Sequence, residues 1–238
     1  MRLEGLDAVI HLAGESVGEG RWTDERRHRI RDSRVEGTRF LAETLARLEK
    51  KPPALLAASA IGYYGDRGGE EMTEDSGPGE GFLPSVGVGW ENATAPAAEA
   101  GIRVVNLRIG VVMTFFGAAL PRIVSSTRFG ASGKIGSGDQ WVSWVSLDDL
   151  IGAIHYCLFR DISGPVNVVS PNPVQNRDLA KTVRGVLGRR GIFRRRPSPL
   201  RRSLERRPRN SSSRPPKPVR PGCSTPAFVS PTANSFTR

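Results

Sequence analysis

The stretch Asp7-Ala-Val-Ile-His-Leu-Ala-Gly14 decides the fold class of this 238-residue chain. It is a short, nearly continuous apolar run closed by a glycine, which is typical of a strand buried on both faces of a parallel sheet. Residues 24–50 follow with apolar side chains at helical spacing, and Thr23 stands where a capping residue is expected. A buried strand that leads into a long amphipathic helix predicts a strand–helix–strand crossover.

The same unit recurs along the chain. Strands are predicted at 54–59, 102–112, 141–145 and 166–169. Helices are predicted at 82–100, 118–128, 147–159 and 176–187, with Ser146 and Asn176 as caps of the last two and with Pro96 kinking or ending the first. This alternation predicts an α/β protein, a partial Rossmann-like doubly wound parallel sheet with helices on both faces.

Charge is distributed unevenly along the chain. Residues 189–238 contain 14 of the 35 lysines and arginines, 9 of the 18 prolines and one of the 24 acidic residues, Glu205. Because apolar periodicity also stops there, we expect a folded domain over 1–188 and a basic, disordered Arg/Pro/Ser-rich tail over 189–238. The basic pI belongs to this tail, so net charge does not indicate a nucleic-acid partner for the whole protein.

Cysteine and histidine usage and hydropathy exclude several classes of protein. Cys157 and Cys223 lie in segments of different character and do not suggest a disulfide framework, and no apolar stretch reaches the roughly 18 residues of a spanning helix. We therefore expect a cytoplasmic protein without a membrane partner. No histidine has a metal-ligand partner at useful spacing, so we expect no metal site, and His11 is interpreted as a hydrogen-bonded core residue.

The segment Tyr63-Tyr64-Gly65-Asp66 directly follows a predicted strand. Ligands of open parallel sheets bind at the carboxyl ends of the strands, which favours a functional role. Paired tyrosines in a glycine-rich turn are also common packing residues. Position alone leaves both interpretations open.

Taken together, segments between about residues 5 and 188 resemble the epimerase-like atypical short-chain dehydrogenase/reductase family, of the extended, sugar-nucleotide-epimerase-like type. The segments that carry this resemblance, in order and spacing, are residues 7–15, 21–23, 30–38, 59–66, 107–112, 136–141, 148–150 and 163–167. The resemblance implies an NAD(P)-dependent oxidoreductase or epimerase, with NAD or NADP as cofactor and a small-molecule substrate, of which a nucleotide sugar is one candidate.

The resemblance also implies site residues. Ser59 and Tyr64 are the predicted catalytic residues, because a hydroxyl and a phenol handle the proton that accompanies hydride transfer. Small residues at the end of the first strand would let a dinucleotide approach the backbone. The predicted cofactor-binding residues are Leu12, Ala13, Gly14 and Arg108.

The sequence departs from the family pattern in several places: Thr114-Phe-Phe-Gly117 replaces a glycine-rich loop, the resemblance stops at Gly188, and two further departures bear on catalysis and on the cofactor. Residues 82–91 lack the usual Tyr-x-x-x-Lys, and no glycine-rich pyrophosphate loop or set of three preceding strands is found before residue 7. We therefore expect a first strand with an unpaired edge and impaired cofactor binding. Two alternatives stay open: a non-catalytic fold remnant or gene-model artefact, and a nucleic-acid-associated protein that uses the basic tail, although aromatic residues there are sparse.

Overall fold

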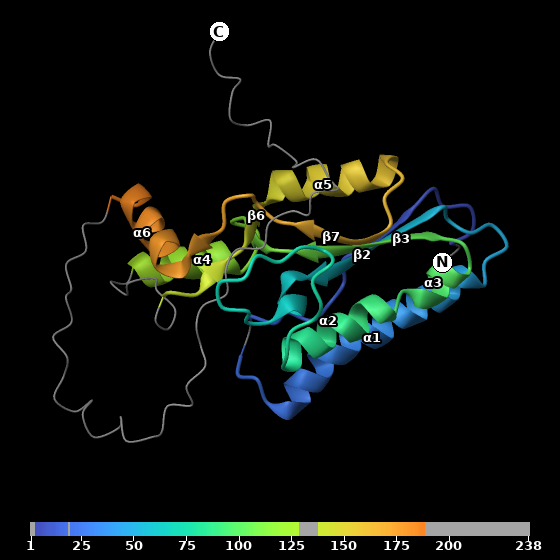
Figure 1. The fold of residues 1–238 in the computed structure, drawn as a ribbon, viewed down its shortest axis with the longest axis horizontal. Coiled ribbons are helices and arrows are strands. Elements are labelled where there is room, and N and C mark those ends of the chain that lie inside the picture. The colour runs from blue at the N-terminus through green and yellow to red at the C-terminus, as the bar shows by residue number, and fades with distance from the viewer. Residues whose placement is uncertain (1–2, 19, 129–137, 189–238) are drawn as a thin grey trace, which may run out of the picture.

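A four-stranded parallel sheet in the order β1-β2-β3-β7 forms the centre of the computed structural model, which describes residues 3–18, 20–128 and 138–188 (Figure 1). Every neighbouring pair in this sheet is parallel. The strands are β1 (Val9–His11), β2 (Ala54–Ala60), β3 (Arg103–Ile109) and β7 (Gly164–Val168). The predicted α/β fold class is confirmed.

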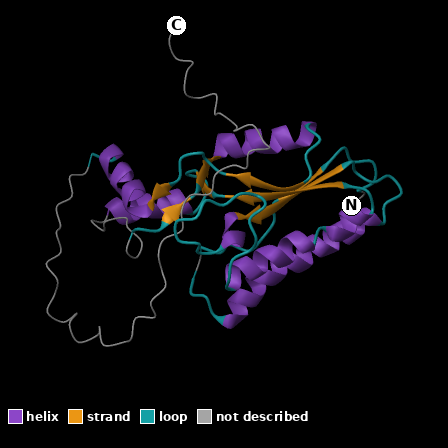
Figure 2. Ribbon diagram, viewed as in Figure 1, coloured by secondary structure: helices purple, strands orange, loops and turns teal. Residues whose placement is uncertain are grey.

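Helices cover both faces of the sheet, as the sequence predicts (Figure 2). One face carries α1 (Asp24–Ala46), α2 (Phe82–Asn92) and α3 (Ala95–Glu99), and the other carries α5 (Leu147–Phe159). Two capping hydroxyls set where these helices begin: Thr23 Oγ1 accepts a hydrogen bond from the Arg26 amide (3.3 Å), and Ser146 Oγ accepts one from the Asp149 amide (3.0 Å).

Strand β2 supplies both halves of the core, because successive side chains of a strand point to opposite faces. Leu55 packs with Leu45 of α1 and Ala97 of α3, whereas Leu56 belongs to the cluster that contains Leu150 of α5. All but the last residue of β2 are buried. A strand covered on two faces explains why its sequence is continuously apolar rather than alternating.

Strand β1 is less buried than the sequence predicts. Its residues are half-buried or exposed, and the Ile10 side chain is 45% exposed. The physical reason is its place in the sheet: within the described part of the chain β1 pairs only with β2 and forms an edge. The expectation of burial on both faces is therefore wrong for this strand, while the expected unpaired edge is what these residues show.

The helix predicted over 82–100 is two helices. α2 ends at Asn92 and α3 begins at Ala95 with Pro96 in its first turn. Proline lacks the amide hydrogen that a continuing helix needs, so the chain restarts the helix with proline in its first turn, where that donor is not required. The predicted cap of the last helix is also wrong: in α6 (Asn176–Val186) Gln175 occupies the capping position and makes no side-chain capping bond.

The strand predicted over 102–112 breaks at Gly110. β3 ends at Ile109, and β4 (Val111–Met113) pairs instead with β6 (Trp144–Ser146). A Cβ on Gly110 would lie 2.8 Å from the Ser143 carbonyl oxygen, so glycine allows the two backbones to approach. The strand predicted over 141–145 is likewise divided: β6 pairs with β4, whereas β5 (Trp141–Val142) pairs antiparallel with β8 (Val174–Gln175).

These short strands and α4 (Ala119–Arg128) and α6 form a small lobe beside the main sheet (Figure 1). The expected tail over 189–238 falls outside the described residues, as do residues 129–137 between α4 and β5.

Candidate active site

A cavity of about 480 Å³ lies at the carboxyl ends of β2 and β3, between α1 and α2. This is the edge of an open parallel sheet at which ligands bind. Its lining is largely apolar and is rich in small residues from four different segments, namely Ala58, Ala60, Gly62, Gly87 and Gly110. Small residues leave room for a flat ligand to lie against the ends of the strands.

Helix α2 turns one apolar stripe toward this cavity. Leu83, Val86, Gly87 and Trp90 line it. The residues four apart on this face are Leu83 with Gly87 and Val86 with Trp90, and none of them has a titratable side chain. Of the described cavity-lining residues, those from α2 therefore offer no proton donor of the Tyr-x-x-x-Lys kind. Gly87 has a packing role, because a Cβ there would lie 3.2 Å from the Tyr63 Cα.

A row of polar residues crosses the sheet beside the cavity. The strand register aligns Ser59 of β2 with Arg108 of β3, and Arg108 with Asn167 of β7. Glu91 at the end of α2 joins the row: its carboxylate accepts from Arg108 Nε and Nη2 (both 2.8 Å) and from Ser59 Oγ (2.7 Å). We call Ser59, Tyr64, Glu91, Arg108 and Asn167 the Glu91 network.

Tyr64 closes this network on its other side. Its hydroxyl accepts from Arg108 Nη1 (2.8 Å) and donates to Asn167 Oδ1 (2.7 Å). Tyr64 and Arg108 are 1% and 3% exposed. Burial raises the pKa of Tyr64, with the Arg108 hydrogen bond opposing it. Burial alone would lower the pKa of Arg108, but its hydrogen bonds to Glu91 and Tyr64 hold that pKa above the ordinary value.

The structure thus brings three of the predicted site residues, Ser59, Tyr64 and Arg108, together in a buried network. Ser59 also lines the cavity, whereas the tyrosine among the described lining residues is Tyr63. The Arg108 guanidinium lies 3.8 Å from the centroid of the Tyr63 ring. Sequence reasoning singled out the Tyr63-Tyr64 pair but assigned the catalytic role to Tyr64, and it did not name Glu91; the signal for Glu91 was its position as the one charged residue of α2.

The predicted cofactor-binding residues fall into two groups. Arg108 belongs to the Glu91 network, while Leu12, Ala13 and Gly14 form an exposed segment at the carboxyl end of β1. A Cβ on Gly14 would lie 3.2 Å from Cζ of Arg34, a residue of α1 that lines the cavity. Their assignment to a cofactor stays a prediction.

His11 makes the hydrogen bond expected of it. Its Nε2 lies 3.1 Å from the Thr38 hydroxyl oxygen, and that oxygen accepts a hydrogen bond from Trp90 Nε1 (3.0 Å). Because the Thr38 oxygen accepts from Trp90, its own hydrogen is available to donate to Nε2 of a neutral imidazole. Burial lowers the pKa of His11 below its ordinary value, in agreement with this arrangement.

This environment predicts a loss of stability in mild acid. The folded pKa of His11 is lower than the unfolded pKa, so in mild acid the imidazole is protonated more readily in the unfolded chain than in the folded one. The free energy of unfolding is therefore fully retained above about pH 6.5 and decreases as pH falls through the folded pKa. We expect the melting temperature of His11→Gln to fall less between pH 7 and 5 than that of the unchanged protein. His155→Gln, on the exposed side of α5, is the control; parallel curves for His11→Gln and the unchanged protein would contradict the prediction.

Within residues 3–18, 20–128 and 138–188, no group of three or more His, Cys, Asp or Glu side chains is placed to hold a metal ion. A helix with the length and apolar character needed to cross a membrane is likewise not found in that part of the chain.

Comparison with known proteins identifies relatives of this chain. The chain is 37% identical over 178 residues to an epimerase family protein of Mycobacterium bovis, covering 74% of this chain and 58% of the relative. It is 38% identical over 183 residues to one of Bacillus subtilis, covering 76% and 60%. The chain thus spans about three-fifths of the length of these relatives.

Two solved structures are similar. The nucleoside-diphosphate sugar epimerase of Corynebacterium glutamicum matches with a TM-score of 0.66 and 42% identity, over 76% of this chain and 38% of that one. Human epimerase family protein SDR39U1, solved with NADPH, matches with a TM-score of 0.74 and 31% identity, over 80% and 66%. The family model described as "NAD dependent epimerase/dehydratase family" matches residues 1–169. This chain belongs to the NAD dependent epimerase/dehydratase family.

Proposed function

We propose that this protein is an NAD(P)-dependent oxidoreductase or epimerase that acts on a small molecule, with nucleotide sugars as the substrate class. The cavity at the ends of β2 and β3 carries this proposal, because it combines a ligand-binding position with an apolar lining and a hydroxyl, Ser59. Two relatives support the chemistry: a nucleoside-diphosphate sugar epimerase at 42% identity, and a protein solved with NADPH at 31%.

The residues present fit the nicotinamide end of such a cofactor. A site of this size falls in the range of about 300 to 1,000 Å³ typical of small-molecule pockets. Ala60, Gly62 and Gly110 leave space for a planar ring, and the exposed segment 12–14 offers backbone for the cofactor to approach. When bound, the nicotinamide would accept or donate a hydride. The chain's own part is to orient the ring, exclude water through the apolar lining and handle the accompanying proton.

The predicted catalytic pair divides into two roles in this proposal. Ser59 lines the cavity, and its hydroxyl, held by the Glu91 carboxylate, is placed to contact substrate. Tyr63 supplies the phenol of the lining. Tyr64 acts as a positioning residue, because its hydroxyl is engaged by Arg108 and Asn167 and so fixes the turn that carries Tyr63.

This division of roles predicts opposite phenotypes for neighbouring tyrosines. Tyr64→Phe should lower the free energy of unfolding by about 1–3 kcal/mol, because Arg108 Nη1 and Asn167 Oδ1 lose a buried partner. Tyr63→Phe and Ser59→Ala should change stability less but weaken nucleotide-sugar binding, measured by calorimetry with UDP-glucose. A Tyr64→Phe variant of unchanged stability that loses binding would make Tyr64 itself a contact residue.

The proposed function is tested by blocking the cavity. NADPH and NADH are titrated by nicotinamide fluorescence into the unchanged chain and into Ala60→Phe, which places a large side chain in the cavity. Ala98→Phe, on the exposed side of α3, is the matched control. We expect Ala60→Phe to weaken dinucleotide binding by about 10-fold or more, a change of about 1.4 kcal/mol, and the control to stay within about 2-fold. Equal affinities for all three proteins would contradict the cavity assignment.

A further inference from the structure

Arg34 differs from every other residue around the cavity. Among the described residues that line it, Arg34 is the one with a charged side chain. It comes from α1, whose other lining residue, Ile30, is apolar. A single cation in an apolar cavity has a desolvation cost, so its placement calls for an anion or a structural partner.

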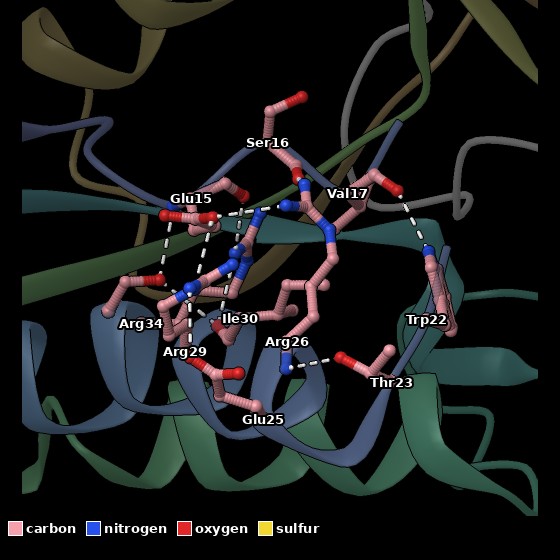
Figure 3. Close-up of polar contacts among 11 residues, drawn as sticks. Glu15, Ser16, Val17, Trp22, Thr23, Glu25, Arg26, Arg29, Ile30 and Arg34 are labelled. Atoms are coloured by element: carbon pink, nitrogen blue, oxygen red, sulfur yellow. Dashed lines mark hydrogen bonds and ion pairs between the residues drawn. The ribbon is translucent and has the colours of Figure 1, made fainter. Parts of the chain in front are cut away.

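The hydrogen bonds of Arg34 within the protein involve one nitrogen of its guanidinium, Nη1. Nη1 donates to the carbonyl oxygens of Glu15 (2.9 Å) and Ile30 (3.1 Å), as Figure 3 shows. Cζ lies 4.9 Å from the centroid of the Trp90 ring, and Gly14 leaves room on another side. These contacts hold the group in place, yet among the described residues Nε and Nη2 have no acceptor.

The nearby acid does not neutralise Arg34. The Glu15 carboxylate lies 3.4 Å from Arg26 Nη1 and 3.7 Å from Arg29 Nε, and only its backbone oxygen accepts from Arg34 (Figure 3). Within the described ranges no carboxylate is in ion-pair distance of Arg34. Burial lowers the pKa of Arg34 and Glu15 offsets this only in part, as expected of a cation that the protein leaves incompletely compensated.

We propose that Arg34 binds a phosphate group at the α1 side of the cavity through its Nε and Nη2 hydrogens. Two adjacent guanidinium donors match two oxygens of one phosphate, which gives geometric selectivity as well as attraction. The proposal rests on the proposed function, in which both ligands carry phosphates. The phosphate belongs either to the pyrophosphate of the cofactor or to the diphosphate of a nucleotide sugar.

The test measures binding of three probes, namely inorganic pyrophosphate, NADP⁺ and UDP, by calorimetry. The variants are Arg34→Gln, which removes the charge, and Arg34→Lys, which keeps the charge but lacks the two adjacent N–H donors of the guanidinium. Arg29→Gln is the control, since Arg29 belongs to the same cluster and its side chain is 54% exposed. Thermal unfolding of each variant is recorded alongside, and Arg34→Lys serves if Arg34→Gln does not fold.

We expect Arg34→Gln to weaken pyrophosphate binding by about 10- to 100-fold, Arg34→Lys by less, and Arg29→Gln by no more than about 2-fold. A matching loss for NADP⁺ alone assigns the contact to the cofactor, and a loss for UDP alone assigns it to the substrate. Unchanged affinity of Arg34→Gln for all probes, an equal loss in Arg29→Gln, or absence of binding by the unchanged chain would overturn the proposal.

Failure of this inference is distinguishable from failure of the proposed function. If Ala60→Phe abolishes NADPH binding while Arg34→Gln binds every probe normally, the cavity assignment stands and the phosphate contact does not. If Arg34→Gln loses pyrophosphate while Ala60→Phe leaves NADPH binding unchanged, the phosphate contact stands and the cavity assignment fails.

Discussion

Replacement of Glu91 by glutamine is expected to lower the free energy of unfolding by about 3–5 kcal/mol, the usual cost of breaking a buried ion pair from one side. Arg108 is 3% exposed, and its Nε and Nη2 both donate to the Glu91 carboxylate. Glutamine keeps the shape of glutamate but offers one acceptor oxygen and an NH₂ group. The buried Arg108 cation is then left without a counter-charge, and Ser59 or Arg108 loses its acceptor.

The measurement is urea unfolding followed by circular dichroism. Glu43→Gln is the matched control, because Glu43 of α1 pairs with Arg47 and their side chains are 43% and 81% exposed. Such surface pairs contribute about 0–1 kcal/mol, so the control should shift little. In the double variant with Arg108→Gln, the loss should be smaller than the sum of the single losses. A Glu91→Gln effect no larger than that of Glu43→Gln would show that the pair is not a structural anchor.

The convergence of Ser59 and Arg108 is predictable from the sequence because both stand near the ends of neighbouring parallel strands. Once β2 and β3 are placed side by side, the register alone puts these residues opposite each other. Strand β2 is predicted correctly because burial on two faces makes it continuously apolar. The exposure of β1 depends on which strands pair with it. The apolar run 7–13 carries no information about that pairing, so it predicts burial on both faces.

Other features of the site have no local signal. Tyr63 and Tyr64 lie in the short 3-10 turn Ile61–Tyr64, where the strand alternation that assigns side chains to faces no longer holds. Arg34 is one of many arginines on α1, and only the packing of Gly14 and Trp90 around it distinguishes it. The break at Gly110 is similarly hidden within an apolar run, because its cause is the distant Ser143 carbonyl.

The turn that carries both tyrosines also depends on a loop that closes over it. Gly79 belongs to the long segment between β2 and α2, and its amide donates to the Tyr63 carbonyl oxygen (3.0 Å). A Cβ on Gly79 would collide with the carbonyl oxygen of Tyr64, and would lie 2.6 Å from the Tyr64 carbonyl carbon and 2.8 Å from the Gly65 Cα. All of these are backbone atoms, so no rotamer change relieves the overlap.

Gly79→Ala is therefore expected to lower the free energy of unfolding by about 3 kcal/mol or more, at the upper end of overpacking effects. Gly77→Ala is the matched control two residues away: nothing lies within 4 Å of a Cβ there, so its effect should stay within about 0.5 kcal/mol. Both are measured by thermal unfolding, with near-ultraviolet circular dichroism for the tyrosine environment. Because relief of the overlap must displace Tyr64, Gly79→Ala should also weaken NADPH binding in the molecules that remain folded. Equal melting temperatures for the two alanine variants would mean that the loop does not hold the tyrosine turn against the sheet.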